Sequence, residues 1–152
     1  MDHESAFTAF TRDVEPRLRR ALVALRGRDE GRDATAEALA WAWEHWSEVQ
    51  EMANPVGYLY RVGQSRTRQR RDLPPLTLID HHDPEYEPGL GPALARLSDH
   101  QRTAVVLVHG CEWTYQEVAD ALGLTKSSVG THVARGLSRL RQELEVEMEH
   151  HG

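Results

Sequence analysis

The helix start and stop signals between residues 114 and 125 constrain the fold of this chain more than any other feature. Thr114 with Glu117 fits a capping box that opens a helix, and Gly123 supplies the backbone freedom for the tight turn that ends it. Thr125 then fits the N-cap of a second, longer helix. A short helix, a glycine turn and a longer helix are the parts of a helix-turn-helix, whose second helix enters the major groove of DNA.

The rest of the chain is also patterned for helices, because no apolar–polar alternation is long enough for a sheet. Near the N-terminus, apolar residues spaced by three and four form one stripe: Phe7, Phe10, Val14, Leu18, Leu22 and Leu25. Pro16 interrupts that stripe, so either the helix kinks there or a new helix begins. A third helix is expected from Asn54, a good N-cap that directly precedes a proline.

The second helix is expected between the N-terminal apolar stripe and Asn54, from about residue 33 to residue 48. On it, Trp43 and Trp46 share a face with Leu39 and are predicted to lie in the core. Trp41 points elsewhere, and an exposed indole on this helix would make a good contact for a protein partner.

Residues 73–91, LPPLTLIDHHDPEYEPGLG, have the composition of a flexible linker. They hold four of the seven prolines, and their acidic residues lie close together. We therefore expect an all-α chain of two small helical domains joined by this linker, the C-terminal one a helix-turn-helix. The expected boundaries are 1–72 for the first domain, 92–145 for the second and 146–152 for a tail.

The net charge of −6 argues against a nucleic-acid partner, but the distribution of charge does not. Residues 61–71 hold five arginines and no acid, whereas residues 72–91 hold five acids and neither lysine nor arginine. Residues 92–142 hold six basic residues against four acids, and the last ten residues add four glutamates. The acidity is concentrated in the linker and the tail, so two basic regions remain for contact with DNA.

The outward face of the second helix of the pair is small and polar, with a few basic residues. Its residues are Thr125, Lys126, Ser127, Ser128, Thr131, His132 and Arg135. Such side chains and a helix N-terminus can contact phosphates or base edges. Thr114 and Tyr115 begin the preceding helix, which would lie across the phosphates. The alternative is a helical hairpin whose polar face is merely solvated.

With both halves in view, the chain resembles the extracytoplasmic-function sigma factors of bacteria. The C-terminal match runs from LARLSDHQRTAVVLVHGCEWTYQEVADALGLTKSSVG to ARGLSRLR and resembles the region that binds the −35 promoter element. The N-terminal match is AFTAFTRDVEPRLRRAL, AEALAWAWEHW and NPVGYLYRVGQSRTRQRR. It resembles the region that binds the polymerase clamp and opens the −10 element. The resemblance implies a cytoplasmic sigma factor that binds core RNA polymerase and promoter DNA, and an anti-sigma factor is an expected partner.

By this resemblance, the third helix and the loop before it face the non-template strand. Aromatic residues followed by cations suit this role, because bases stack on aromatic rings and arginines follow phosphates. The residues concerned are Tyr58, Tyr60, Arg61, Arg66 and Arg68. The two tyrosines are two residues apart and cannot share a helix face, so one of them is expected to be buried. The alternative is that both tyrosines belong to the core and the arginines form a solvated helix end.

The sequence departs from the family pattern at two places. Where the family carries an acidic EDLVQE-like run, this chain has RDATAE, and only Asp33 and Glu37 remain acidic for the polymerase contact, beside Trp41. Where the recognition helix of the family has Lys and Arg, this chain has Gly130 and His132. Each phosphate that is no longer neutralised lowers the salt slope of DNA binding by about 0.9.

Two other functions stay open from the sequence: a helix-turn-helix regulator that is not a sigma factor, and a degenerate sigma-like adaptor. No nucleophile–base constellation or nucleotide-binding motif is evident, so we expect no enzyme and no cofactor. The segment HHDPE has no closed four-ligand pattern, so no metal site is expected. The single cysteine, Cys111, is expected to be buried and inert, and no apolar run is long enough to span a bilayer.

Overall fold

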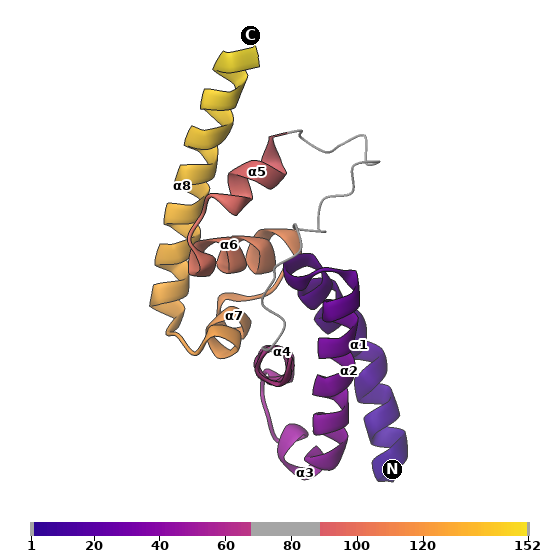
Figure 1. Cartoon of the computed structure of the whole chain (residues 1–152). Coiled ribbons are helices and arrows are strands. Elements are labelled where there is room, and N and C mark those ends of the chain that lie inside the picture. The colour runs from indigo at the N-terminus through magenta and orange to yellow at the C-terminus, as the bar shows by residue number, and fades with distance from the viewer. Residues whose placement is uncertain (1, 68–88, 152) are drawn as a thin grey trace.

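The computed structural model describes residues 2–67 and 89–151, and all its regular elements in those ranges are helices. In chain order they are α1 (His3–Arg26), α2 (Arg28–Glu44), α3 (Trp46–Val49), α4 (Pro55–Arg66), α5 (Leu90–Ala95), α6 (Asp99–Val105), η1 (Val106–Gly110), α7 (Tyr115–Leu122) and α8 (Lys126–His151). The helices α1 to α4 form an N-terminal body, and α5 to α8 form a C-terminal body around the helix-turn-helix (Figure 1). The predicted all-α fold is thus confirmed.

Helix α1 is one element, and no new helix begins at Pro16. Its N-cap is Asp2, whose side chain accepts a hydrogen bond of 2.7 Å from the backbone N–H of Ser5. The proline ring is exposed, while Val14 and Leu18 on either side of it are buried. The apolar stripe therefore continues across the proline and packs against α2.

Small residues set the distance between helices in the N-terminal body. A Cβ atom added at Gly31 of α2 would lie 2.5 Å from the Cα atom of Val23 in α1. A Cβ added at Gly63 of α4 would lie 2.8 Å from the carbonyl oxygen of Ala34 in α2. Such contacts are shorter than van der Waals packing allows, so α2 lies close to both neighbours because its contacts are glycine and alanine.

The structure corrects the prediction for one tryptophan of the second helix. Trp46 is buried as predicted, but Trp43 is 49% exposed and contacts the ring of Phe7 edge-on, at 5.0 Å between centroids. The spacing argument assumed one helix through both residues. Although α2 ends at Glu44, both indoles still contact Phe7 edge-on. Trp43 is exposed because it lies at the edge of the buried face of α2, which is formed by Ala34, Thr35, Ala38 and Ala42.

Two helices of the C-terminal body begin at capping boxes, and the one at Thr114 lies where the sequence predicted it. Ser98 and Gln101 form a capping box at the start of α6, and Thr114 and Glu117 form another at the start of α7. The element η1, a turn of π-helix that continues α6, was not predicted. It ends where the N–H of Cys111 donates to the carbonyl of Val106 at 3.0 Å, and this cysteine is buried as expected.

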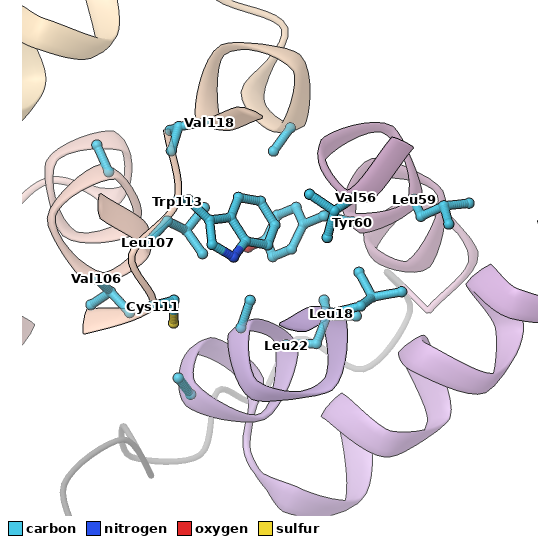
Figure 2. Packing of buried hydrophobic residues seen from close by; sticks show 14 of the residues in the cluster. Leu18, Leu22, Val56, Leu59, Tyr60, Val106, Leu107, Cys111, Trp113 and Val118 are labelled. Carbon is cyan, nitrogen blue, oxygen red and sulfur yellow. The ribbon is translucent and has the colours of Figure 1, made fainter. Parts of the chain in front are cut away.

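The two bodies share a hydrophobic core instead of standing apart. Helix α4 lies between α2 and α7 (Figure 1). Figure 2 shows the indole of Trp113, which precedes α7, reaching toward Tyr60 of α4, with Leu18 and Leu22 of α1 below. The rings of Trp113 and Tyr60 meet edge-on at 5.7 Å between centroids. The domain boundaries expected from the sequence therefore separate segments that are packed together in this structure.

Two glycines of α8 provide a matched test of this packing. A Cβ at Gly136 would lie 2.7 Å from Cγ2 of Val105, whereas one at Gly130 would lie 3.5 Å from the Tyr115 ring. Both substitutions to alanine favour the helix by about 0.5–1 kcal/mol. We expect Gly130→Ala to raise the free energy of unfolding by that amount, and Gly136→Ala to lower it by about 1–3 kcal/mol through overpacking. Urea unfolding measures both, and equal effects would contradict the close α6–α8 contact.

Candidate nucleic-acid interface

The turn between α7 and α8 has the geometry that the sequence signals predicted. Gly123 adopts the left-handed conformation, with φ 67° and ψ 36°, and so ends α7. The chain then turns, and the N–H of Leu124 donates to the carbonyl of Ala119 at 2.9 Å. At the start of α8, the hydroxyl of Thr125 accepts a hydrogen bond of 3.1 Å from the N–H of Ser128. This turn fixes the direction in which α8 leaves α7.

The first turns of α8 divide cleanly into an inner and an outer face. Val129 and Val133 are buried against the rest of the body. The outer face carries the exposed residues Thr125, Lys126, Ser127, Thr131 and Arg135, with Ser128 and His132 half-buried at its edge. An exposed row of hydroxyl and cationic groups at a helix start can contact phosphates and base edges.

Tyr115 adds an aromatic ring beside this face. It is 39% exposed, and its Cε2 atom would lie 3.5 Å from a Cβ added at Gly130. The ring therefore covers the place where the family pattern has a lysine side chain. Thr114, also exposed, uses its hydroxyl to accept the N–H of Glu117 at 3.1 Å, so its side chain is engaged in capping.

His132 is held in a pair of imidazoles. Its ring meets the ring of His100 from α6 edge-on at 5.2 Å between centroids, and its buried Nδ1 atom has no hydrogen-bond partner among the described residues. Burial lowers the pKa of His132, and the nearby His100 and Arg135 lower it further. At neutral pH the outer face of α8 therefore has no cation at residue 132, where the family pattern has an arginine.

A second surface, which carries aromatic rings beside arginines, lies on α4. Tyr58 is 37% exposed, and Arg61 and Arg66 are exposed on the same side of the helix. Together with Trp41 of α2 they border a groove of about 280 Å³, whose lining residues are Trp41, Tyr58, Arg61, Val62, Ser65 and Arg66. The rings of Trp41 and Tyr58 are tilted at 5.3 Å between centroids. Aromatic rings beside arginines are the groups that hold single-stranded bases and phosphates.

Tyr60 faces the opposite way, in agreement with the expectation that one of the two tyrosines is buried. It is 2% exposed, and its hydroxyl accepts a hydrogen bond of 2.8 Å from Nε2 of Gln64. Burial raises the pKa of Tyr60 to about 12. In this arrangement Tyr60 belongs to the core and cannot contact DNA.

The other predicted site residues are distributed more widely. Glu37 accepts a hydrogen bond from Arg66 at 3.2 Å, and Asp33 is exposed on the same helix. Trp41 is half-buried and stacks on His45 at 4.2 Å between ring centroids. Arg68 and the segment HHDPE lie outside the described residues. Within residues 2–67 and 89–151, no cluster of three potential metal-ligating side chains occurs.

Sequence reasoning missed the place of Trp41 in the groove. The groove is built from two helices that are separated in the sequence by α3, and no spacing rule relates Trp41 to Tyr58. It also missed Arg17, whose guanidinium pairs with Glu117 in the other body. The sequence indicated Trp113 only as part of a local hydrophobic staple at the start of α7, and not as a contact with Tyr60.

Comparisons with known proteins agree with this geometry. A sequence profile described as Sigma-70, region 4 matches residues 90–140. The RNA polymerase sigma-E factor of Streptomyces antibioticus is 30% identical over 132 residues, covering 77% of this chain and 72% of the relative. The RNA polymerase sigma-E factor of Streptomyces coelicolor is 28% identical over 127 residues, covering 76% and 72%.

Solved structures show the same fold at lower identity. The sigma factor RpoE in complex with the anti-sigma factor NepR from Bartonella quintana has a TM-score of 0.70 at 22% identity, covering 93% of this chain and 98% of that one. CnrH in complex with the cytosolic domain of CnrY has a TM-score of 0.62 at 18% identity, covering 94% and 90%. Among the helices of residues 2–67 and 89–151, none combines the length and apolar character needed to cross a bilayer.

The depressed pKa of His132 predicts how stability depends on pH. The unfolded chain takes up a proton at this residue near the ordinary value of 6.5, while the folded chain takes it up only at lower pH. This contribution to stability is therefore complete above pH 6.5 and is lost as the pH falls through the folded-state pKa. We expect the melting temperature to fall on acidification from pH 7.5 to 5.5, and to fall less in His132→Asn. An unchanged pH profile in the variant would contradict the interpretation.

Proposed function

The chain belongs to the extracytoplasmic-function family of RNA polymerase sigma factors, and from this premise we propose how its surfaces act in starting transcription. It is not an enzyme itself; it is the subunit with which RNA polymerase initiates at promoters. The observation that carries the residue-level proposal is the capped helix-turn-helix with an exposed polar helix start, inside the segment that matches region 4. We place its work in the cytoplasm, with polymerase and DNA.

The outer face of α8 binds the duplex at the −35 element. Lys126 and Arg135 contact phosphates, and Ser127 and Thr131, which lie between them on the exposed face, reach base edges. Thr125, Ser128 and His132 border this face, and Thr114 and Tyr115 contact the backbone from the start of α7. Since Gly130 carries no side chain and His132 is held neutral, DNA binding by this surface alone is weak. Polymerase compensates by holding the chain beside the promoter.

The groove on α4 holds the opened −10 element. A base stacks on Tyr58 and Trp41, while Arg61 and Arg66 contact the flanking phosphates. Stacking of about 1–3 kcal/mol per base offsets the few kcal/mol needed to flip each base out of the duplex. We extend the proposed phosphate contacts to Arg68 from the sequence alone.

The surface of α2 binds polymerase through Asp33 and Glu37. Trp43 supplies the exposed indole that the sequence had suggested for Trp41, because Trp41 stacks on His45 and lines the groove. An anti-sigma factor is a further partner of the kind seen in the two related structures. We keep the division into residues 1–72, 73–91, 92–145 and 146–152 as part of this proposal, although α5 begins at Leu90 and α8 continues to His151.

Run-off transcription with core RNA polymerase on genomic fragments tests the proposal directly. We expect discrete start sites with the wild-type chain and none with core polymerase alone. Lys126→Ala with Arg135→Ala should weaken promoter binding and reduce the slope of log affinity against log salt by about 0.9 for each phosphate that the variant no longer neutralises. Absence of polymerase binding by the wild-type chain would exclude the proposed function. An unchanged salt slope would exclude the assigned contacts.

Tyr58 should act in opening the promoter rather than in locating it. Tyr58→Ala removes the ring, and we expect about 5- to 150-fold less open complex, which corresponds to about 1–3 kcal/mol of stacking. Permanganate reactivity of unpaired thymines measures promoter opening. A gel shift of closed complexes, in which the promoter is still paired, measures promoter binding. Tyr58→Phe keeps the ring and is the matched control. If the Phe variant were as defective as the Ala variant, stacking would not be the role of this residue.

A further inference from the structure

The indole of Trp41 is held from one side by the ring of His45. The two rings are nearly parallel, with 14° between their planes and 4.2 Å between their centroids. Nδ1 of His45 also lies 2.9 Å from the backbone carbonyl oxygen of Trp41. Because a carbonyl oxygen only accepts hydrogen bonds, Nδ1 carries the hydrogen and donates it. The His45 side chain is therefore fixed by two contacts, and both are made with the same residue.

Of these two rings, only the indole lines the groove beside α4. There it meets the ring of Tyr58, at 5.3 Å between centroids and with 44° between the planes. Arg61 and Arg66 border the same groove, so rings and cations are arranged together. His45 can therefore act on a base in the groove only through Trp41.

The end of helix α2 does not by itself require the ring of His45. This residue is the C-cap of α2, and its backbone N–H donates to the carbonyl of Trp41 at 2.9 Å. Ending the helix uses that backbone hydrogen bond, whereas the parallel stack of the two rings adds nothing to it. What the stack does is limit the rotation of the indole. A side chain that is already fixed binds more tightly, because immobilising a free one on binding weakens affinity by about 2- to 12-fold.

We propose that His45 is a positioning residue, which holds the Trp41 indole in the orientation on which an unpaired base stacks. This inference rests on the proposed function, because it concerns the groove assigned to the opened −10 element. His45 contacts the indole and not the DNA. Its ring therefore affects the stacking of a base, while the contacts of Arg61 and Arg66 with phosphates do not depend on it. Loss of the ring should weaken the binding of bases and leave the binding of phosphates unchanged.

The holoenzyme assembled from core RNA polymerase and the full-length chain allows these two contributions to be measured separately. Two labelled probes are compared by fluorescence anisotropy: a single-stranded thymidine decamer, and a decamer of abasic sites with the same phosphates. The ratio of the two affinities measures stacking, with core polymerase alone as the background. We expect Trp41→Ala to lower this ratio about 5- to 150-fold. His45→Ala should lower it about 2- to 12-fold, with the affinity for the abasic decamer unchanged.

Three further variants distinguish positioning from a purely structural role. His45→Phe keeps a ring that can stack on the indole, and should restore the ratio to the wild-type value. His45→Asn keeps an N–H donor but no ring, and should behave as His45→Ala does. His109→Ala is the matched control, because it makes the same chemical change at an exposed histidine of η1, and its ratio should equal that of the wild type.

The two probes also show which part of the argument fails. An equal loss of affinity for both decamers in His45→Ala would mean that the histidine serves only the structure of α2, and would overturn the proposal. An unchanged ratio in His45→Ala, or a phenylalanine variant no better than the alanine one, would overturn it as well. If the wild-type chain formed no complex with core polymerase in gel filtration, the proposed function itself would be wrong. A complex whose ratio did not exceed that of core polymerase alone would instead exclude the groove as the place where bases stack.

Discussion

The carboxylate of Glu117 connects the local start of a helix to the arrangement of the whole molecule. One of its oxygens accepts the N–H of Thr114 at 2.9 Å and closes the capping box of α7. The same oxygen and its neighbour accept the two donors of Arg17. These hydrogen bonds lower the pKa of Glu117, with Arg17 the largest cause, so the group is fully ionised at neutral pH. The group that begins the first helix of the helix-turn-helix thus also anchors that motif to the N-terminal body.

Helix α4 is the element on which both bodies depend, because it is packed closely on two sides. Gly63 lies against the α2 backbone, and Gly57 lies against the α7 backbone. The residues are six apart, which at 100° per residue places them on different faces of the helix. The third side carries Tyr58 and Arg61 and remains exposed. One short helix therefore has a face for its own body, a face for the other body and an exposed face that carries an aromatic ring and a cation.

Local signals predicted more of this structure than long-range ones. The capping residues Ser98 and Thr114 were predictable because each acts on backbone groups within one turn. The exposure of Trp43 was not, because it lies at the edge of the buried face of α2, and periodicity does not show which of two neighbouring positions faces the core. The groove on α4 and the Arg17–Glu117 pair could not be predicted from the sequence either. The pair spans 100 residues, and no pattern of spacing records which helices pack together.

The pairing of Tyr60 with Trp113 is a main apolar contact between the two helical bodies. Separating the bodies would bring into water two aromatic side chains that are now almost fully buried. Each fully buried large side chain contributes about 1.5–3 kcal/mol relative to exposure. Contacts of this kind favour packing of the two bodies, whereas the exposed positions of Arg17 and Arg20 limit what their polar contacts add. Apolar packing, more than the charged contacts, therefore holds the C-terminal body against the N-terminal one.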